Sequence, residues 1–300
     1  MVFSMSAPTV YLLVPVHNRR DITVQFAKEI AAQTYDNLVF ILIDDGSTDS
    51  TAEGVRDVCP DVKVIEADGN LWWAGSLQKG LDYIHDAGAN DEDIVIMSND
   101  DVILDEKFVQ TGVDLLASKP GSLLLPQHRE TVDAAPKETG VFLNRKTLRI
   151  EVASSPDKIN CLSTRGLFLT WKTTKEIGGF YTRILSHYGS DYEWTARAGR
   201  KGFKLWTNPS LSLVPMPEQT GHRSTTGKPT LSELMTHFFS KRSTSNIFMR
   251  SVLYALTGSP PHVPRILLHY WYVCAKQAGE ATVRSLVALV GLKKRPEKNE

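Results

Sequence analysis

Short apolar segments that end in polar residues recur along the first half of the chain. Residues 10–16, 38–43 and 94–97 are almost entirely apolar, and runs of this length are typical of strands buried on both faces of a sheet. Residues 62–66 form a fourth candidate strand. Because doubly buried strands belong mostly to parallel sheets covered by helices, the pattern predicts an α/β fold.

Helical spacing fills the gap between the first two of these segments. Residues 22–33 place Ile22, Phe26 and Ile30 on one face of a helix, and Asp21 could act as its N-cap. A strand–helix–strand unit of this kind is typical of parallel pairing.

A second helix is expected over residues 50–59. Gly46 permits a tight turn before it, and one of residues 47–49 can cap its first turn. The strands before these helices should therefore end at a common edge of the sheet, where open α/β proteins bind their ligands.

The second half of the chain is less regular. We expect a hairpin within residues 139–151, a strand at 167–170 followed by a short helix, and a loop that enters a helix within 186–197. Apolar residues recur at helical spacing from Leu231 onward. The sequence thus predicts an open, mostly parallel sheet flanked by helices in residues 1–220, and a helical extension in residues 221–300.

Two adjacent carboxylates, Asp100 and Asp101, follow the apolar run at residues 94–97. Such groups at a strand end need water, a partner or a cation. Mg²⁺ or Mn²⁺ would satisfy them, since both ions prefer oxygen ligands. An Asx turn is the structural alternative, and this segment alone leaves the two open.

Three blocks of polar and acidic residues follow the predicted strands in order. They are Val14-Pro15-Val16-His17-Asn18-Arg19, Ile43-Asp44-Asp45-Gly46-Ser47-Thr48-Asp49 and Asn99-Asp100-Asp101. Together these blocks resemble family 2 glycosyltransferases with the GT-A fold, and the resemblance covers about residues 8 to 215. Residues 70–76 also resemble a block of the bacterial rhamnosyltransferase-like members.

The resemblance implies roles for the acidic residues in these blocks. Asp45 would accept the imino proton of a uracil or thymine ring, whereas Asp44 and Asp49 are read as local capping groups. Asp100 would contact the ribose, or the metal indirectly, and Asp101 would ligate Mg²⁺ or Mn²⁺. Asn99 stands at the first position of the usual Asp-x-Asp pattern.

Further residues are expected to contact the nucleotide sugar. Aromatic faces can stack on sugars or bases, so Trp72 and Trp73 are candidates, although both could instead be core residues. Gly75 suits close approach of the backbone. The loop after the first strand contributes Pro15, His17, Asn18 and Arg19.

The acidic loop of the family aligns with residues 190–194, and this places the general base on Asp191. Glu193 is the rival base and, with Trp194, a candidate substrate contact. The alternative for Asp191 is an N-cap, which is compatible with catalysis. His222 lies where some family members have a histidine metal ligand, although a surface-loop histidine is the simpler interpretation.

Composition limits the remaining function classes. A formal net charge of +0 gives no electrostatic case for nucleic acid binding. The three cysteines match no zinc or disulfide spacing and favour a reducing cytosol. We read the N-terminus as the first strand and not as a signal peptide, and no stretch has the roughly 18 apolar residues of a membrane span.

The resemblance implies an inverting, metal-dependent transfer from a nucleoside-diphosphate sugar to a hydroxyl of a glycan or lipid-linked glycan, in bacterial surface polysaccharide synthesis. Two alternatives stay open: a sugar nucleotidyltransferase, whose Gly-rich first loop is absent here, and a non-catalytic nucleotide-sugar-binding scaffold. Basic and aromatic residues in the last third suit peripheral contact with the inner face of the cell membrane. A lid or a homo-oligomer interface is the alternative role for that region.

Overall fold

The computed structural model describes residues 7–216 and 229–293 of the chain. Within these residues, eight strands form one sheet in the order β3-β2-β1-β4-β9-β6-β10-β5, in which β9 and β5 run against the others. The strands are β1 (Val10–Val16), β2 (Leu38–Asp44), β3 (Lys63–Glu66), β4 (Ile94–Met97), β5 (Val102–Ile103), β6 (Ser122–His128), β9 (Leu167–Thr170) and β10 (Lys204–Pro215).

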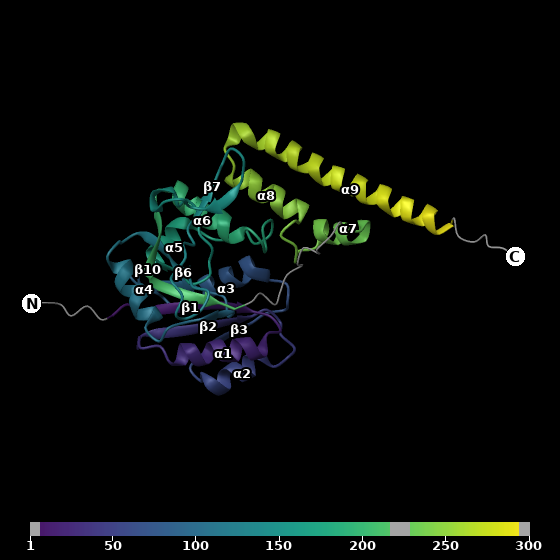
Figure 1. Cartoon of the computed structure of the whole chain (residues 1–300). Helices are drawn as coiled ribbons and strands as arrows, with labels where there is room; N and C mark the ends of the chain where they lie inside the picture. Colours follow the sequence, from purple (N-terminus) through teal and green to yellow (C-terminus); the bar gives the residue numbers. More distant parts are fainter. Residues whose placement is uncertain (1–6, 217–228, 294–300) are drawn as a thin grey trace, which may run out of the picture.

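Helices cover both faces of this sheet (Figure 1). The alternation of side chains along β1 shows how the two layers are divided. Val10, Leu12 and Val14 face one core, and Tyr11 and Leu13 face the other. The first core is closed by α1 (Arg20–Ala31), α2 (Thr51–Val58) and α4 (Phe108–Ala117), and the second by α3 (Trp72–Asp86), α5 (Trp171–Ile177) and α6 (Ser190–Arg200).

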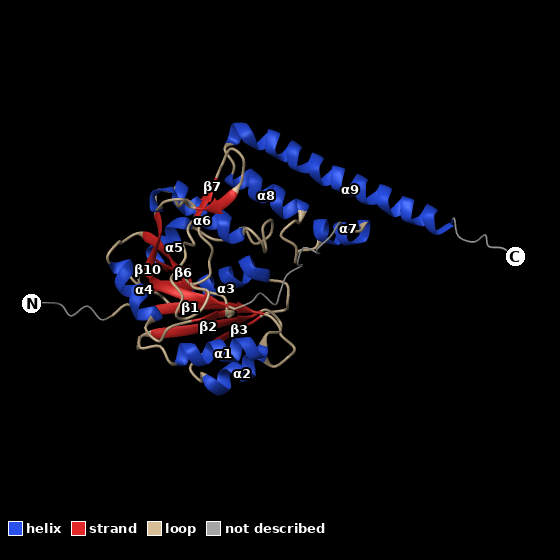
Figure 2. Cartoon of the chain, viewed as in Figure 1, coloured by secondary structure: helices blue, strands red, loops and turns tan. Residues whose placement is uncertain are grey.

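A small hairpin, β7 (Val141–Leu143) with β8 (Ile150–Val152), packs beside α6 and forms a third cluster with Tyr254 of α8. The C-terminal helices are α7 (Leu231–Phe239), α8 (Ile247–Thr257) and α9 (Val263–Lys293). Leu253 of α8 lies against Gly189, just before α6. α9 packs on α7 and α8 and then projects beyond the rest of the molecule (Figure 2).

The α/β architecture, the order of the main elements and the C-terminal helices are confirmed. Two helix starts differ from the expectation. Asp21 lies in the first turn of α1, with Arg19 at the N-cap, and Asp191 lies in the first turn of α6, with Gly189 at the N-cap. The expected division at residue 220 lies outside the described residues.

Candidate active site

The carboxyl ends of β1, β2, β4 and β6 meet at one edge of the sheet, because these strands are parallel. β9 runs in the opposite direction, so the residues before its first residue, Leu167, reach the same edge. This edge therefore brings together the polar segments that follow β1, β2 and β4 with Arg165 from the link before β9.

The loops after β1 and β2 are tied to each other. The Nδ1–H of His17 donates to the carbonyl oxygen of Asp45 at 2.6 Å, and the Asn18 amide donates to Oγ of Ser47 at 2.9 Å. The Thr48 amide in turn donates a 2.8 Å hydrogen bond to Oδ1 of Asn18. Asn18 has a φ of 51°, a left-handed conformation that asparagine tolerates. These contacts fix the rim of the site before any ligand binds.

The neighbouring aspartates have local roles. Asp44 accepts a 2.8 Å bond from the Ser47 amide. Asp49 accepts from the amide of Arg20 and from the amide and hydroxyl of Thr51, and these hydrogen bonds hold the pKa of its carboxyl below the usual value although burial opposes them. Asp44 thus stabilises the turn after β2, and Asp49 ties this loop to the first residues of α1 and α2. The N-cap of α2 is Ser50, whose side chain forms no capping hydrogen bond in the described structure.

Asp45 is buried and holds the start of α3. Its Oδ1 accepts from the amides of Gly69 and Leu71, at 3.0 and 3.1 Å, and its Oδ2 accepts from the Trp72 amide at 2.8 Å. Two carboxylate oxygens offer about four acceptor positions. One position on Oδ2 therefore remains for a donor group of a ligand, and the structural role of Asp45 is compatible with base recognition.

The two tryptophans of α3 point to different environments. Trp73 donates from Nε1 to the Thr164 hydroxyl at 3.1 Å and packs against the second core. Trp72 is partly exposed; its ring lies 5.4 Å from the His187 ring, and the Lys241 ammonium lies 5.4 Å from its centroid. Trp72 is thus the one of the pair that offers a face to a ligand.

Gly75 is buried one turn into α3. A Cβ at this position would lie 3.1 Å from Cβ of Leu71, which is tight contact within the helix start. The lack of a side chain at Gly75 therefore leaves room for the side chain of Leu71.

Asp100 and Asp101 share a cation. Nη2 of Arg19 lies 3.3 Å from an oxygen of each carboxylate, and Nη2 of Arg165 lies 3.7 Å from Oδ1 of Asp101. Asp100 also accepts a 2.7 Å bond from the Thr23 hydroxyl. Burial raises the pKa of Asp100, and Arg19 and Thr23 oppose that rise.

The carboxylate pair fits a divalent metal. Oδ1 of Asp101 is buried and has no hydrogen-bond partner, since the Arg165 nitrogen at 3.7 Å is too distant for one. Mg²⁺ is commonly held by one or two carboxylates, with substrate phosphates and water completing its shell. Within residues 7–216 and 229–293 no group of three His, Cys, Asp or Glu side chains is arranged to hold an ion, so the remaining ligands would come from substrate, water or elsewhere in the chain.

Asp191 lies in the first turn of α6 and is partly exposed. Burial of its carboxyl raises the pKa of Asp191 to about 6, while backbone hydrogen bonds and the charge of Arg165 oppose the rise. A carboxyl group with such a pKa is mostly ionised near neutral pH and binds a proton more strongly than an ordinary aspartate. These are the properties of a general base.

Glu193 and Trp194 are buried and bonded to other groups of the protein. Glu193 is 2% exposed and accepts from Arg197 at 3.0 and 3.2 Å, with Arg200 3.6 Å away. Trp194 is 0% exposed, donates to the Gly178 carbonyl and stacks on Phe180. We therefore leave both residues, which the sequence suggested as substrate contacts, out of the site.

Arg165 and His187 lie at the site, although the sequence patterns did not identify them as site residues. Arg165 stands before a strand that only the sheet order shows to be antiparallel, so no local signal marks it. His187 packs between the rings of Trp72 and Tyr188, its Nδ1 has no hydrogen bond, and burial lowers its pKa to about 4. His222 lies outside the described residues.

Part of the chain resembles a known family in sequence. Residues 11–151 match the family model described as "Glycosyl transferase family 2". No curated protein matches the chain significantly in sequence.

Solved structures share the fold. A mannosyltransferase from Pyrobaculum calidifontis, in complex with GDP-Man and Mn²⁺, has 16% identity and a TM-score of 0.54, with 95% of this chain and 76% of that chain covered. TarS from S. aureus, residues 1–349 in complex with UDP-GlcNAc, has 13% identity and a TM-score of 0.58, with 88% and 71% covered. At these identities the likeness establishes a GT-A-type fold, and the sequence match adds the enzyme class.

Proposed function

We propose that this protein, a glycosyltransferase by its family match, transfers a sugar from a nucleoside-diphosphate sugar to a hydroxyl group with inversion at the anomeric carbon. The observation that supports the proposal is the position of Arg165, which lies beside Asp101 and close enough to Asp191 for its charge to act on that carboxyl group. The guanidinium of Arg165 lies 3.7 Å from Asp101, and its charge also acts on the pKa of Asp191. The carboxylate pair and the candidate base are thus within electrostatic range of one cation.

The donor would bind along the edge formed by β1, β2 and β4. Asp45 has one acceptor position left for a base N–H, and the interlocked loops of His17 and Asn18 would line the nucleoside. Mg²⁺ or Mn²⁺, held by Asp101 with Asp100 beside it, would supply positive charge to the departing diphosphate. Arg19 and Arg165, which neutralise these carboxylates in the described structure, would then be available to phosphate oxygens.

Asp191 would remove the proton from the acceptor hydroxyl as that oxygen attacks the anomeric carbon. The bond to the sugar forms as the bond to the diphosphate breaks, and the proton passes to Oδ of Asp191. A single base with no enzyme nucleophile in the path gives inversion. Glu193 is a poor alternative, because Arg197 and Arg200 surround its carboxylate.

A glycan or lipid-linked glycan would bind beside Trp72. The partly exposed ring, with His187 and Lys241 around it, offers an aromatic face for a sugar and a cation nearby. The likeness of residues 70–76 to rhamnosyltransferase-like proteins supports a deoxysugar donor in surface polysaccharide synthesis. The cytoplasm is the expected location, because activated sugar donors are made there.

The third helix of the C-terminal region supports a peripheral membrane contact. α9 exposes large apolar side chains, and basic residues accompany them along the same helix. No helix of the described segments has the length and apolar character needed to cross a membrane. A helix that lies in a membrane interface combines exposed apolar side chains with basic residues. The exposed apolar residues of α9 are Leu268, Trp271, Tyr272, Val283, Leu286 and Val287.

Sedimentation with anionic vesicles tests this contact. We expect binding at low salt that weakens at high salt, and loss of binding when Trp271 and Tyr272 are both changed to serine. Equal sedimentation of the double variant, or no binding at low salt, would remove the membrane role and leave self-association through α9 as the use of this face.

A thermal-shift screen tests the donor. Uridine-, deoxythymidine- and guanosine-diphosphate sugars are added with and without Mn²⁺, and the preferred donor should raise the midpoint by mass action, more so with the metal. A nucleotidyltransferase, which joins a nucleotidyl group to a sugar phosphate and releases pyrophosphate, would instead be stabilised by a nucleoside triphosphate and a sugar phosphate. A scaffold would bind the donor but release no nucleoside diphosphate with any acceptor.

A further inference from the structure

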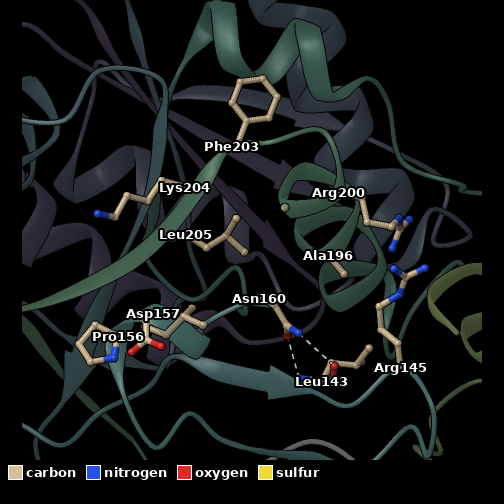
Figure 3. A pocket seen from close by; sticks show the side chains of 12 residues that line it. Leu143, Arg145, Pro156, Asp157, Asn160, Ala196, Arg200, Phe203, Lys204 and Leu205 are labelled. Atoms are coloured by element: carbon tan, nitrogen blue, oxygen red, sulfur yellow. Dashed lines mark hydrogen bonds between the residues drawn. The ribbon is translucent and has the colours of Figure 1, made fainter. Parts of the chain in front are cut away.

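A cavity of about 400 Å³ is lined by Arg145, Ala196 and Arg200 among others (Figure 3). It lies at the C-terminal end of α6, whereas Asp191 lies in the first turn of that helix. Its wall includes Arg200 at the last residue of α6 and Lys204 at the first residue of β10. Because β10 is parallel to β6, its first residue lies toward the edge of the sheet away from the carboxylate pair. The cavity is therefore separate from the active site.

Part of the cavity wall is apolar. Leu143, Ile159 and Leu205 line it and are 2%, 8% and 4% exposed. Asn160, also in the wall, is occupied by two bonds to the backbone of Leu143 at 2.8 and 3.1 Å. A volume of this size holds a small organic molecule, and these three side chains, which we call the floor, offer it apolar contact.

The rim is cationic. Arg145, Arg200 and Lys204 contribute three positive charges, against one negative charge from Asp157 among the lining residues. Figure 3 shows the guanidinium groups of Arg145 and Arg200 turned toward each other. Like charges in this arrangement repel, and an anion between them would reverse the sign of the interaction.

The protein neutralises this pair only in part. The Arg145 guanidinium donates to the carbonyl oxygens of Thr257 and Gly258, at 3.0 and 3.4 Å, which carry no net charge. Arg200 lies 3.6 Å from Glu193, but Arg197 already holds that carboxylate at 3.0 Å. Burial lowers the pKa of Arg200, and the charge of Arg145 adds to this effect while Glu193 opposes it. Arg197 and Arg200 thus share one carboxylate, and among the described residues Arg145 is bonded only to uncharged carbonyl groups.

We infer that this cavity binds a phosphate monoester with a ring-sized apolar body, its phosphoryl oxygens between Arg145 and Arg200 and its body on the floor of Leu143, Ile159 and Leu205. Two guanidinium forks match phosphoryl oxygens in geometry. A phosphate monoester carries a charge of about −1.5 to −2 near neutral pH, which matches the excess of the rim better than the single charge of a carboxylate does.

Such a ligand would link three parts of the molecule. Arg145 belongs to the hairpin connection and already touches the end of α8, and Arg200 ends the helix that carries Asp191. Occupancy would therefore favour the packing of α8 on α6. The binding itself does not depend on the proposed sugar transfer.

Calorimetric titration with phenyl phosphate and with inorganic phosphate tests the inference. Phenyl phosphate should bind more tightly than inorganic phosphate, because its ring contacts the floor. Arg200→Gln and Arg145→Gln should each weaken phenyl phosphate binding by about tenfold or more, since each removes hydrogen bonds to a charged group. Arg149→Gln, an exposed change on the same hairpin, is the matched control and should bind as the wild type does.

A fourth variant separates this cavity from the diphosphate site. Arg165→Gln changes the other edge of the sheet and should leave phenyl phosphate binding unchanged. The inference is overturned if binding is lost in Arg165→Gln but kept in Arg200→Gln, if the ring adds no affinity, or if Arg149→Gln weakens binding as much as the cavity variants do. Circular dichroism verifies that each variant is folded, and Arg145→Gln decides the outcome if Arg200→Gln is not.

Discussion

Asp191→Asn should abolish most of the activity and at the same time stabilise the protein. The substitution keeps the shape of the side chain and its ability to accept backbone hydrogen bonds, but it removes the proton acceptor. General-base catalysis is worth about 10²- to 10⁴-fold, so we expect kcat to fall within that range while donor affinity changes little.

The stability gain follows from the pKa of Asp191. Burial raises it from the usual 3.8 to about 6, so the folded protein holds this proton more tightly than the unfolded chain does. The protonated form contributes stability that is fully present below about pH 4 and is lost as pH rises through 6. The loss above pH 6 is on the order of 2–3 kcal/mol, and an asparagine, which never ionises, avoids it.

Thermal unfolding of both proteins from pH 4 to pH 8 measures the effect. The Tm values should coincide near pH 4 and diverge as pH rises, and above pH 6 the variant should unfold roughly 4–6 °C higher, at about 2 °C per kcal/mol for a chain of this size. Wild-type kcat/KM should fall below about pH 6 as the base becomes protonated.

Asp114→Asn is the control, because Asp114 is exposed on α4 and should produce no pH-dependent difference in Tm. A Tm difference for Asp191→Asn that does not change with pH would refute the reasoning about burial. Activity close to that of the wild type would refute the role of Asp191 as base.

Three further substitutions distinguish the roles assigned to neighbouring residues. Asp100→Ala should weaken donor binding strongly in a calorimetric titration, because Arg19 and Thr23 lose the carboxylate that orients them; unchanged affinity would remove Asp100 from the site. Glu193→Gln should lower the free energy of unfolding by on the order of 3 kcal/mol in a denaturant titration, because two arginines lose their buried counter-ion. The folded variant should keep its turnover. A larger loss of kcat than in Asp191→Asn would make Glu193 the base instead of Asp191. Arg165→Gln should move the acidic limb of the kcat/KM profile to higher pH, because the charge that lowers the pKa of Asp191 is removed; a limb at the same pH would separate Arg165 from the base.

The fold could be predicted from the sequence because the patterns that specify its strands and helices are local. The apolar runs of β1, β2 and β4 specify buried strands, and the helices between them have one apolar stripe each. Helix starts were less predictable. Asp21 and Asp191 are good capping residues that lie inside the first turn, since tertiary contacts decide where each helix begins.

The site could be predicted only in part, because some of its residues are brought together by tertiary contacts that no local pattern encodes. Asp100 and Asp101 come shortly after β4, which ends at Met97, so the strand determines their place at the edge of the sheet. Arg165 reaches that edge only because β9 is antiparallel between β4 and β6, and nothing near it in sequence encodes this pairing. Trp194 was expected at the substrate and lies in the core, because its position on α6 faces the sheet.

Release of nucleoside diphosphate by Asp101→Ala, compared with the wild type, tests the central claim most directly. The preferred nucleotide sugar is supplied with a hydroxyl acceptor and Mn²⁺, with Asp114→Ala as the control for an exposed carboxylate. We predict turnover in the wild type and in Asp114→Ala, loss of turnover in the wild type with EDTA, and a folded but inactive Asp101→Ala. Near-native turnover by Asp101→Ala, or full wild-type activity in EDTA, would contradict a metal-assisted transfer at this edge of the sheet.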